Sequence, residues 1–307
     1  MKNVINYYYN LYPENIHQNN NMYYFYLLGD KYFFIIYSRP REDIGAIYEL
    51  NRLLSRHNSL NSELLLNKEK NIITLVNNIP YLLLKVHMNA TAPISILDIE
   101  EMSKFVQTNR EMDILKRDDW VKLWSEKIDY FEYQISQFGN NYPIIRESLS
   151  YFIGMAENAI SYVKNAHLET APNNLDNLVV QNKRISHEYT LFDFYNPMNV
   201  VIDHKSRNIS EYIKYSFIYN KINFEEIYRY FENNYFSKYG IRLFFGRMLY
   251  PSFYFDLYED VIEKRRDEKD LLVIIKKVND YEDFLQDLFV FLSKKYDLPK
   301  VEWLIKK

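Results

Sequence analysis

The most informative stretch of the chain lies between residues 184 and 214, where a histidine and an aspartate are separated by one short segment. His187 is followed by the apolar run Val200-Val201-Ile202, and this run ends at Asp203. A carboxylate at the end of a strand is a suitable ligand for Mg²⁺. Phosphoryl transfer needs such an ion together with a residue that orients the acceptor hydroxyl. The layout therefore indicates a phosphate-transfer loop in which Asp203 would be the metal ligand.

Two positions of this loop carry residue types that do not suit the reaction. The working loop of small-molecule kinases has the pattern His-x-Asp-x(4)-Asn, in which the Asp is the base and the Asn helps to hold the metal. Here the first slot holds Tyr189 and the second holds Phe194. A tyrosine does not accept a proton as a carboxylate does, and a phenylalanine cannot ligate Mg²⁺. Glu188 and Asp193 are the nearby carboxylates, and a shift of register could place Glu188 in the site.

His187 and Asp203 also have purely structural interpretations. The segment Asp203-His204-Lys205-Ser206 is good turn chemistry, so the aspartate could equally well cap a turn. The six histidines of the chain show no close ligand spacing, and a metal site built from them is not expected. We expect His187 to pack against the strand that ends at Asp203 and to hydrogen-bond its backbone.

The groups that would bind phosphate are missing from their usual positions or lie beside them. The loop at residues 18–21 is Gln-Asn-Asn-Asn without a glycine, which favours a plain turn. The following strand, YFFIIYS at 32–38, contains no lysine. Lys31 lies at its start and Arg39 after its end, and either side chain could reach a phosphate. Glu49, in the next helix, is at the position of the usual ion-pair partner, but without a lysine opposite we interpret it as a surface residue.

Composition excludes several classes of protein. With 307 residues and 48% hydrophobic content, the chain can bury a substantial core in two lobes. The net charge of −3 gives no reason to expect a nucleic acid partner. The absence of cysteine excludes disulfides and thiolate catalysis. No run approaches the roughly 18 apolar residues of a membrane helix, and the N-terminal residues lack the apolar core of a signal peptide. We therefore expect synthesis in the cytoplasm and no membrane partner.

Hydrophobic periodicity predicts an α+β protein with two parts. Strands are expected at 22–28, 31–38, 72–76 and 81–86, with one helix at 41–57. Helices are then expected at 99–108, with Asp98 as N-cap, at 120–138, at 143–165 and from 208 onward. In the helix at 120–138, the apolar stripe is Trp120, Leu123, Trp124, Ile128 and Phe131. This order predicts a β-rich N-terminal domain at 1–90 and a mostly helical domain at 91–307.

The aromatic segment RLFFGRMLYPSFYF, at residues 242–255, predicts buried core of the helical part, with an assembly surface as the alternative. Arg242 and Arg247 are separated by a helical distance within it. They could anchor buried carboxylates in that core.

Four segments of the second part carry a resemblance to a known family. They are DWVKLW at 119–124 with the helix that follows, ESLSYFIGMAENAISY at 147–162, IDHKSRNISEYIK at 202–214 and GIRLFFGRMLYPSFYF at 240–255. In order and spacing they resemble the spore-coat kinase-like proteins of endospore-forming bacteria, the CotS and YutH group, and most of all the YutH type. The resemblance implies an aminoglycoside-phosphotransferase-like and protein-kinase-like two-lobe fold, location in the spore coat and other coat proteins as partners. It implies no substrate.

Three functions remain open from the sequence. The first is a catalytically silent, kinase-like scaffold of the spore coat, for which no cofactor is expected. The second is an active small-molecule phosphotransferase that uses ATP and Mg²⁺, with Asp203 on the metal and Glu188 or Asp193 as base. The third is an unrelated helical interaction module, which the absence of a five-stranded sheet in the first 90 residues would favour.

Overall fold

The computed structural model describes residues 1–307 except 20–21, 58–62, 87–90, 108, 187 and 306–307. The chain forms two compact units. The first comprises Met1–Lys116, Val179–Lys183 and Glu188–Asp203, and the second comprises Arg117–Leu178, Arg184–His187 and His204–Lys307. The domain boundary expected near residue 90 stays a prediction, because a compact unit need not coincide with a lobe.

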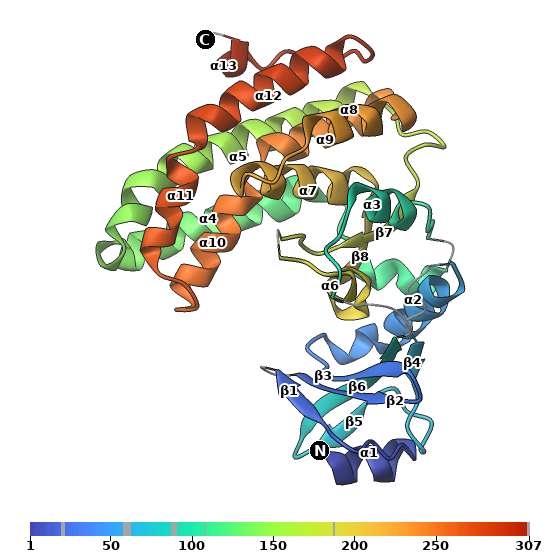
Figure 1. The fold of residues 1–307 in the computed structure, drawn as a ribbon. Coiled ribbons are helices and arrows are strands. Elements are labelled where there is room, and N and C mark those ends of the chain that lie inside the picture. Colours follow the sequence, from blue (N-terminus) through green and yellow to red (C-terminus); the bar gives the residue numbers. More distant parts are fainter. Residues whose placement is uncertain (20–21, 58–62, 87–90, 108, 187, 306–307) are drawn as a thin grey trace. The chain divides into compact units, whose positions relative to one another are not determined.

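The first unit contains a six-stranded antiparallel sheet (Figure 1). Its order is β1-β2-β3-β6-β4, with β5 also paired to β6. The strands are β1 (His17–Asn19), β2 (Met22–Leu27), β3 (Asp30–Ile36), β4 (Glu63–Leu65), β5 (Thr74–Val76) and β6 (Ile79–Val86). All of them lie within the first 90 residues. The absence of a five-stranded sheet there, which would have favoured an unrelated helical module, is therefore contradicted.

Tight turns join β2 to β3 and β5 to β6, and backbone conformation explains them. Leu28 and Gly29 have φ angles of 52° and 87° between β2 and β3, and Asn77 and Asn78 have 50° and 65° between β5 and β6. Two successive positive φ angles match the twist of a tight hairpin, and glycine and asparagine tolerate them best. Alternation then divides the sheet into two faces. One face buries Phe25, Phe34 and Leu83 against Ile5 of helix α1 (Lys2–Tyr9), and these residues form a core.

Helices of the first unit begin close to the predicted positions, with one correction. The predicted helix at 41–57 is η1 (Arg41–Asp43) followed by α2 (Ile44–His57), and a further short helix, η2, spans Arg110–Leu115. The helix predicted from residue 99 is α3 (Ile96–Met102), and its N-cap is Ser95. Asp98 was wrongly predicted as the N-cap. Its carboxylate accepts hydrogen bonds from the Ser95 backbone N–H at 2.8 Å and hydroxyl at 2.7 Å, which forms a capping box.

In its described residues, the second unit is mostly helical. Its helices are α4 (Trp120–Phe138), η3 (Gly139–Asn141), α5 (Pro143–Glu169), α7 (Ser206–Ile218), α8 (Phe224–Asn233), α9 (Lys238–Leu249), α10 (Ser252–Ile262), η5 (Glu268–Asp270), α11 (Leu271–Ile275), α12 (Val278–Ser293) and α13 (Glu302–Ile305). Helix α4 has the predicted bounds, but Leu123 of its predicted stripe is 39% exposed while Trp120 and Phe131 are buried.

Helices α5 and α9 run side by side (Figure 1), and their approach depends on Gly246. A Cβ at that position would lie 2.5 Å from Cγ2 of Val163.

Among the described residues, no helix combines the length and apolar character that a membrane crossing requires.

Candidate functional site

Two paired strands hold the segment that the sequence singled out. Strand β7 (Leu178–Asn182) pairs with β8 (Val200–His204), and helices α6 (Leu191–Tyr195) and η4 (Pro197–Asn199) lie between them in sequence. Every residue of β8 is buried, and Asp203 has no exposed surface. The described residues contain no group of three or more histidine, aspartate or glutamate side chains that could hold a metal ion. The role of Asp203 as a metal ligand stays a prediction.

The two substituted slots have different environments. Tyr189 is half-buried, and its carbonyl accepts a hydrogen bond from the Ile94 N–H at 3.4 Å. Phe194 lies in α6 with no exposed surface, and its backbone carbonyl accepts a hydrogen bond from the Asn182 side chain at 2.8 Å. The position expected for the metal-binding asparagine is therefore occupied by an apolar side chain of the buried core. Glu188 is exposed, and His187 lies outside the described residues.

Asp193, the second suggested base, is the third residue of the helix in which it lies and bonds back to the N-cap Thr190. Its Oδ2 accepts hydrogen bonds from the Thr190 backbone N–H at 3.0 Å and from the Thr190 hydroxyl at 2.7 Å. Its backbone carbonyl accepts a third from the Asn199 side chain at 3.0 Å. This is a capping box at the N-terminus of α6, so one oxygen of the carboxylate is already engaged twice.

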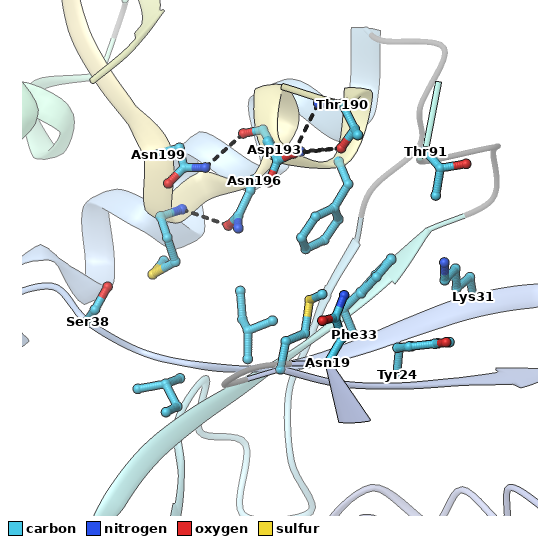
Figure 2. A pocket seen from close by; sticks show the side chains of 15 residues that line it. Asn19, Tyr24, Lys31, Phe33, Ser38, Thr91, Thr190, Asp193, Asn196 and Asn199 are labelled. Carbon is cyan, nitrogen blue, oxygen red and sulfur yellow. Dashed lines mark hydrogen bonds between the residues drawn. The ribbon is translucent and has the colours of Figure 1, made fainter. Parts of the chain in front are cut away.

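A cavity of about 760 Å³ lies between the second face of the six-stranded sheet and the α6–η4 segment (Figure 2). Its volume is in the range of a small-molecule site. The lining side chains come from the sheet, from the segments after β3 and β6, and from the α6–η4 segment with the Thr190 that precedes it: Asn19, Met22, Tyr24, Lys31, Phe33, Ile35, Ile36, Ser38, Thr91, Thr190, Phe192, Asp193, Asn196, Met198 and Asn199. The structure therefore brings Lys31 and Asp193 to one cavity, which neither Glu49 nor Asp203 lines.

Aromatic rings surround the cation of this cavity. The ammonium of Lys31 lies 4.8 Å from the ring centroid of Tyr24 and 4.9 Å from that of Phe33. Phe33 in turn stacks on Phe192 with centroids 4.0 Å apart. Glu49 instead forms an ion pair of 2.8 Å with Arg52 on the same helix. Lys31 is therefore held by the quadrupoles of ring faces, and no described carboxylate forms an ion pair with it.

Arg39, the alternative phosphate-binding cation, is fully committed to the fold. Its Nε donates to Oδ2 of Asp43 at 2.9 Å, and its NH1 donates to the carbonyl of Val200 at 2.7 Å. Both side chains of the ion pair are almost completely buried. The sequence carried a signal for this pair, because Arg39 and Asp43 are four residues apart.

The predicted anchoring of buried carboxylates by arginines is confirmed at one of the two positions. Arg247 contacts Glu211 at 3.0 Å, and both side chains are buried. Arg242 instead contacts Glu169, whose side chain is 56% exposed. Lys214 also donates to Glu211 at 3.0 Å. Burial would raise the pKa of Glu211, but the charges of Lys214 and Arg247 outweigh it and hold this pKa well below its usual value.

The buried cluster joins three of the four segments that carried the family resemblance. The guanidinium of Arg247 lies 4.6 Å from the ring centroid of Trp120, in the first segment. Lys214, in the third, donates to the hydroxyl of Ser252 in the fourth at 2.6 Å. A buried charge is costly unless it is paired and hydrogen-bonded, so these segments depend on one another.

The lining of the cavity determines what chemistry is available there. Its stacked rings and single lysine suit a planar or anionic group. The one carboxylate that lines it, among the described residues, is Asp193. Because that carboxylate caps α6, the cavity as described has no carboxylate dedicated to accepting a proton from an acceptor hydroxyl.

The solved structures to which this chain is similar include two antibiotic phosphotransferases. The chain is similar to an aminoglycoside phosphotransferase from Alicyclobacillus acidocaldarius, with a TM-score of 0.65, 10% identity and 96% of each chain covered. It is also similar to the AMP-bound spectinomycin phosphotransferase, with a TM-score of 0.60, 11% identity, and 88% and 93% of the two chains covered. The kinase-like aminoglycoside phosphotransferase fold predicted from the sequence is therefore confirmed.

Sequence comparison gives the family. The chain is 28% identical over 208 residues to the endospore coat-associated protein YutH of Bacillus subtilis (strain 168). This match spans 61% of the chain and 61% of the length of that relative. The family model described as "Spore coat putative kinase YutH" matches residues 2–288. The chain therefore belongs to the YutH family of kinase-like spore-coat proteins.

Proposed function

We propose that this protein is a catalytically silent, kinase-like structural component of the bacterial spore coat. The observation that carries the proposal is the position of Phe194. The slot for a metal-binding asparagine holds a phenylalanine with no exposed surface, so a working metal site would require a different local fold. Tyr189 in the base slot and the capping role of Asp193 support the same conclusion.

The spore-coat part of the proposal rests on the family. A YutH relative is described as endospore coat-associated, and we propose that this chain is made in the cytoplasm and assembles with other coat proteins. Neither a nucleic acid nor a membrane is expected as a partner. A fluorescent fusion followed through sporulation tests the location, and a fusion that stays diffuse in the mother cell would contradict it.

The enzymatic part can be tested by the thermal stability of the purified protein with and without millimolar ATP and Mg²⁺. A ligand that binds the native state at a hundred times its Kd adds about 2.7 kcal/mol to the free energy of unfolding, which is a rise of several degrees in Tm. We expect no rise that depends on Mg²⁺ and no transfer of phosphate. A measured ATP turnover that disappears in Asp203→Ala would overturn the proposal.

One observation favours the alternative, an active small-molecule phosphotransferase with a rearranged site. Lys31 and Asp193 line the same cavity, and that cavity is large enough for a nucleotide. Under this alternative, ATP and Mg²⁺ are the cofactors and Asp193 or Glu188 is the base. Asp193→Asn keeps the shape of the side chain. A turnover that is abolished in this variant, while its Tm changes little, would establish the alternative.

A further inference from the structure

A second cavity of the first unit has no role in the phosphotransferase layout. It measures about 600 Å³ and is lined by Tyr37, Arg39, Pro40, Arg41, Ile44, Asn71, Ile72, Ile73, Leu75 and Pro80. These residues follow β3, begin α2, and lie on and beside the β5–β6 hairpin. None of them lines the cavity that contains Lys31.

Most of the wall is aliphatic, and part of it is open to solvent. Leu75 is 53% exposed, and Ile44 and Ile73 are half-buried. An aliphatic ligand would remove these side chains from water, at about 25 cal/mol for each Å² of apolar surface buried. The apolar part of a ligand would therefore occupy this wall.

The buried polar side chains of the cavity already have hydrogen-bond partners within the first unit. Arg39 forms its ion pair with Asp43 and donates to the carbonyl of Val200. The hydroxyl of Tyr37 donates to the carbonyl of Pro40 at 2.6 Å. The ion pair of Arg39 and Asp43 thus adds no net charge to the cavity. These contacts also hold Pro40 and the start of α2 in place, so the cavity is largely pre-formed.

Two polar side chains at the cavity have no such partners among the described residues. The Arg41 guanidinium is exposed and forms no ion pair or hydrogen bond there. Asn71 uses its backbone N–H and carbonyl to bond Asn67, and its side-chain amide remains open. Glu42, the nearest carboxylate in sequence to Arg41, does not line the cavity. The guanidinium N–H groups of Arg41 and the side-chain amide of Asn71 are therefore available to bind a ligand.

We propose that this cavity binds the carboxy-terminal end of an apolar peptide segment from a partner protein. The Arg41 guanidinium matches a carboxylate, since its donors can bind both oxygens at once. The Asn71 amide has a donor and an acceptor and so matches a peptide group, which a simple aliphatic acid lacks. The wall of Ile44, Ile73 and Leu75 takes the aliphatic side chains. This site shares no lining residue with the cavity that contains Lys31. The proposal therefore does not depend on whether the protein binds a nucleotide or transfers phosphate.

The test uses the full chain and the tripeptide Leu-Leu-Leu, as the free acid and as the C-terminal amide, with octanoate as a third probe. Binding is followed by calorimetry. We expect the free acid to bind at least about fivefold more tightly than the amide, because the amide loses a charge-assisted hydrogen bond. We expect octanoate to bind no better than the amide.

Variants locate the site. Arg41→Gln should remove the difference between acid and amide, and Leu75→Ser should weaken both peptides. Arg229→Gln and Leu97→Ser are matched controls, because these side chains are exposed and lie outside the cavity, and they should bind like the parent. Equal binding of acid and amide, no binding of either peptide, or octanoate binding as tightly as the acid would each overturn the proposal. Unchanged binding in both cavity variants would do the same.

Discussion

His204 and Asp176 form a buried pair in the second unit, with His204 Nε2 lying 3.2 Å from Oδ1 of Asp176. The other ring nitrogen lies 2.7 Å from the hydroxyl of Ser206, and the hydroxyl of Ser237 donates to the same Asp176 oxygen at 2.5 Å. These residue types are those of a hydrolase triad, but all four are buried and Ser206 has no exposed surface. The pair joins the end of β8 to the segment before β7, and Ser237, the N-cap of α9, connects both to the start of that helix.

The Asp176–His204 pair predicts a loss of stability in acid. Burial raises the pKa of Asp176, but hydrogen bonds from His204, Ser237 and the Asn173 N–H outweigh it and lower this pKa below its ordinary value of 3.8. A carboxyl group with a lowered folded-state pKa contributes its full stabilisation above the ordinary value, and this contribution is lost as pH falls through the folded-state pKa. The free energy of unfolding should therefore decrease below about pH 4.

Asp176→Asn tests this dependence by urea unfolding at a series of pH values. The variant should lose about 1–3 kcal/mol at pH 7 and show a shallower decrease in acid. Asp287→Asn is the control, because Asp287 is exposed and has no hydrogen bond among the described residues. It should stay within about 0.5 kcal/mol of the parent at pH 7. An Asp176→Asn curve parallel to that of the parent would show that this carboxylate does not carry the acid sensitivity.

Gly240 lies beside the same pair, and we predict that it does not tolerate a side chain. A Cβ at this position would lie 2.7 Å from Oδ1 of Asp176 and 3.0 Å from the ring of His204. Because these atoms are held in a buried network, Gly240→Ala should cost about 1–3 kcal/mol in thermal or chemical unfolding.

Gly154 offers a matched control within helix α5. Nothing lies within 4 Å of a Cβ at this position, and alanine favours the helical conformation more than glycine. Gly154→Ala should therefore stabilise the protein by about 0.5 kcal/mol. If both variants were destabilised equally, the close approach at Gly240 would not be the cause.

The sequence predicts local structure, such as helix bounds and caps, better than contacts between distant residues. The helix at 120–138 was predicted with the observed bounds, because its apolar stripe repeats at the helical period. Capping boxes at Ser95–Asp98 and Thr190–Asp193 follow a short sequence rule, so the role of Asp193 could have been recognised from its spacing to Thr190. Its candidacy as a base rests only on its closeness in sequence to the base slot at Tyr189.

Contacts between residues far apart in the sequence could not be predicted in this way. His204 and Asp176 are 28 residues apart, and no periodicity connects them. The same is true of Phe33 and Phe192, whose stacked rings line the cavity that also contains Lys31. Such pairs are fixed by the way strands and helices pack, and only the relative positions of whole elements reveal them.

Lys214 provides a test of the buried ion cluster. Its ammonium has no exposed surface and lies 2.6–3.1 Å from four acceptors, on Glu211, on Ser252 and on the carbonyls of Arg247 and Tyr250, which share its three N–H groups. Lys214→Met would remove the donor to the two carbonyls and one of the two charges that stabilise Glu211, which would keep its contacts with Arg247 and Ser252. We expect a loss of about 3 kcal/mol in the free energy of unfolding. Lys122→Met, at a side chain that is 68% exposed, should cost less than about 0.5 kcal/mol.

Phe194 decides whether a phosphotransferase site can be restored by replacing single residues. Phe194→Asn would reinstate the expected metal-binding residue type, but the side chain has no exposed surface. The variant would bury an amide and open a cavity, so we expect a loss of about 3–5 kcal/mol and no transfer of phosphate from ATP. Phe194→Leu keeps the site apolar and should cost less than half as much. A stable Phe194→Asn protein whose Tm rises with ATP and Mg²⁺ would show that the site is only one substitution from binding its nucleotide, and the proposal of a structural role built on this buried ring would then fail.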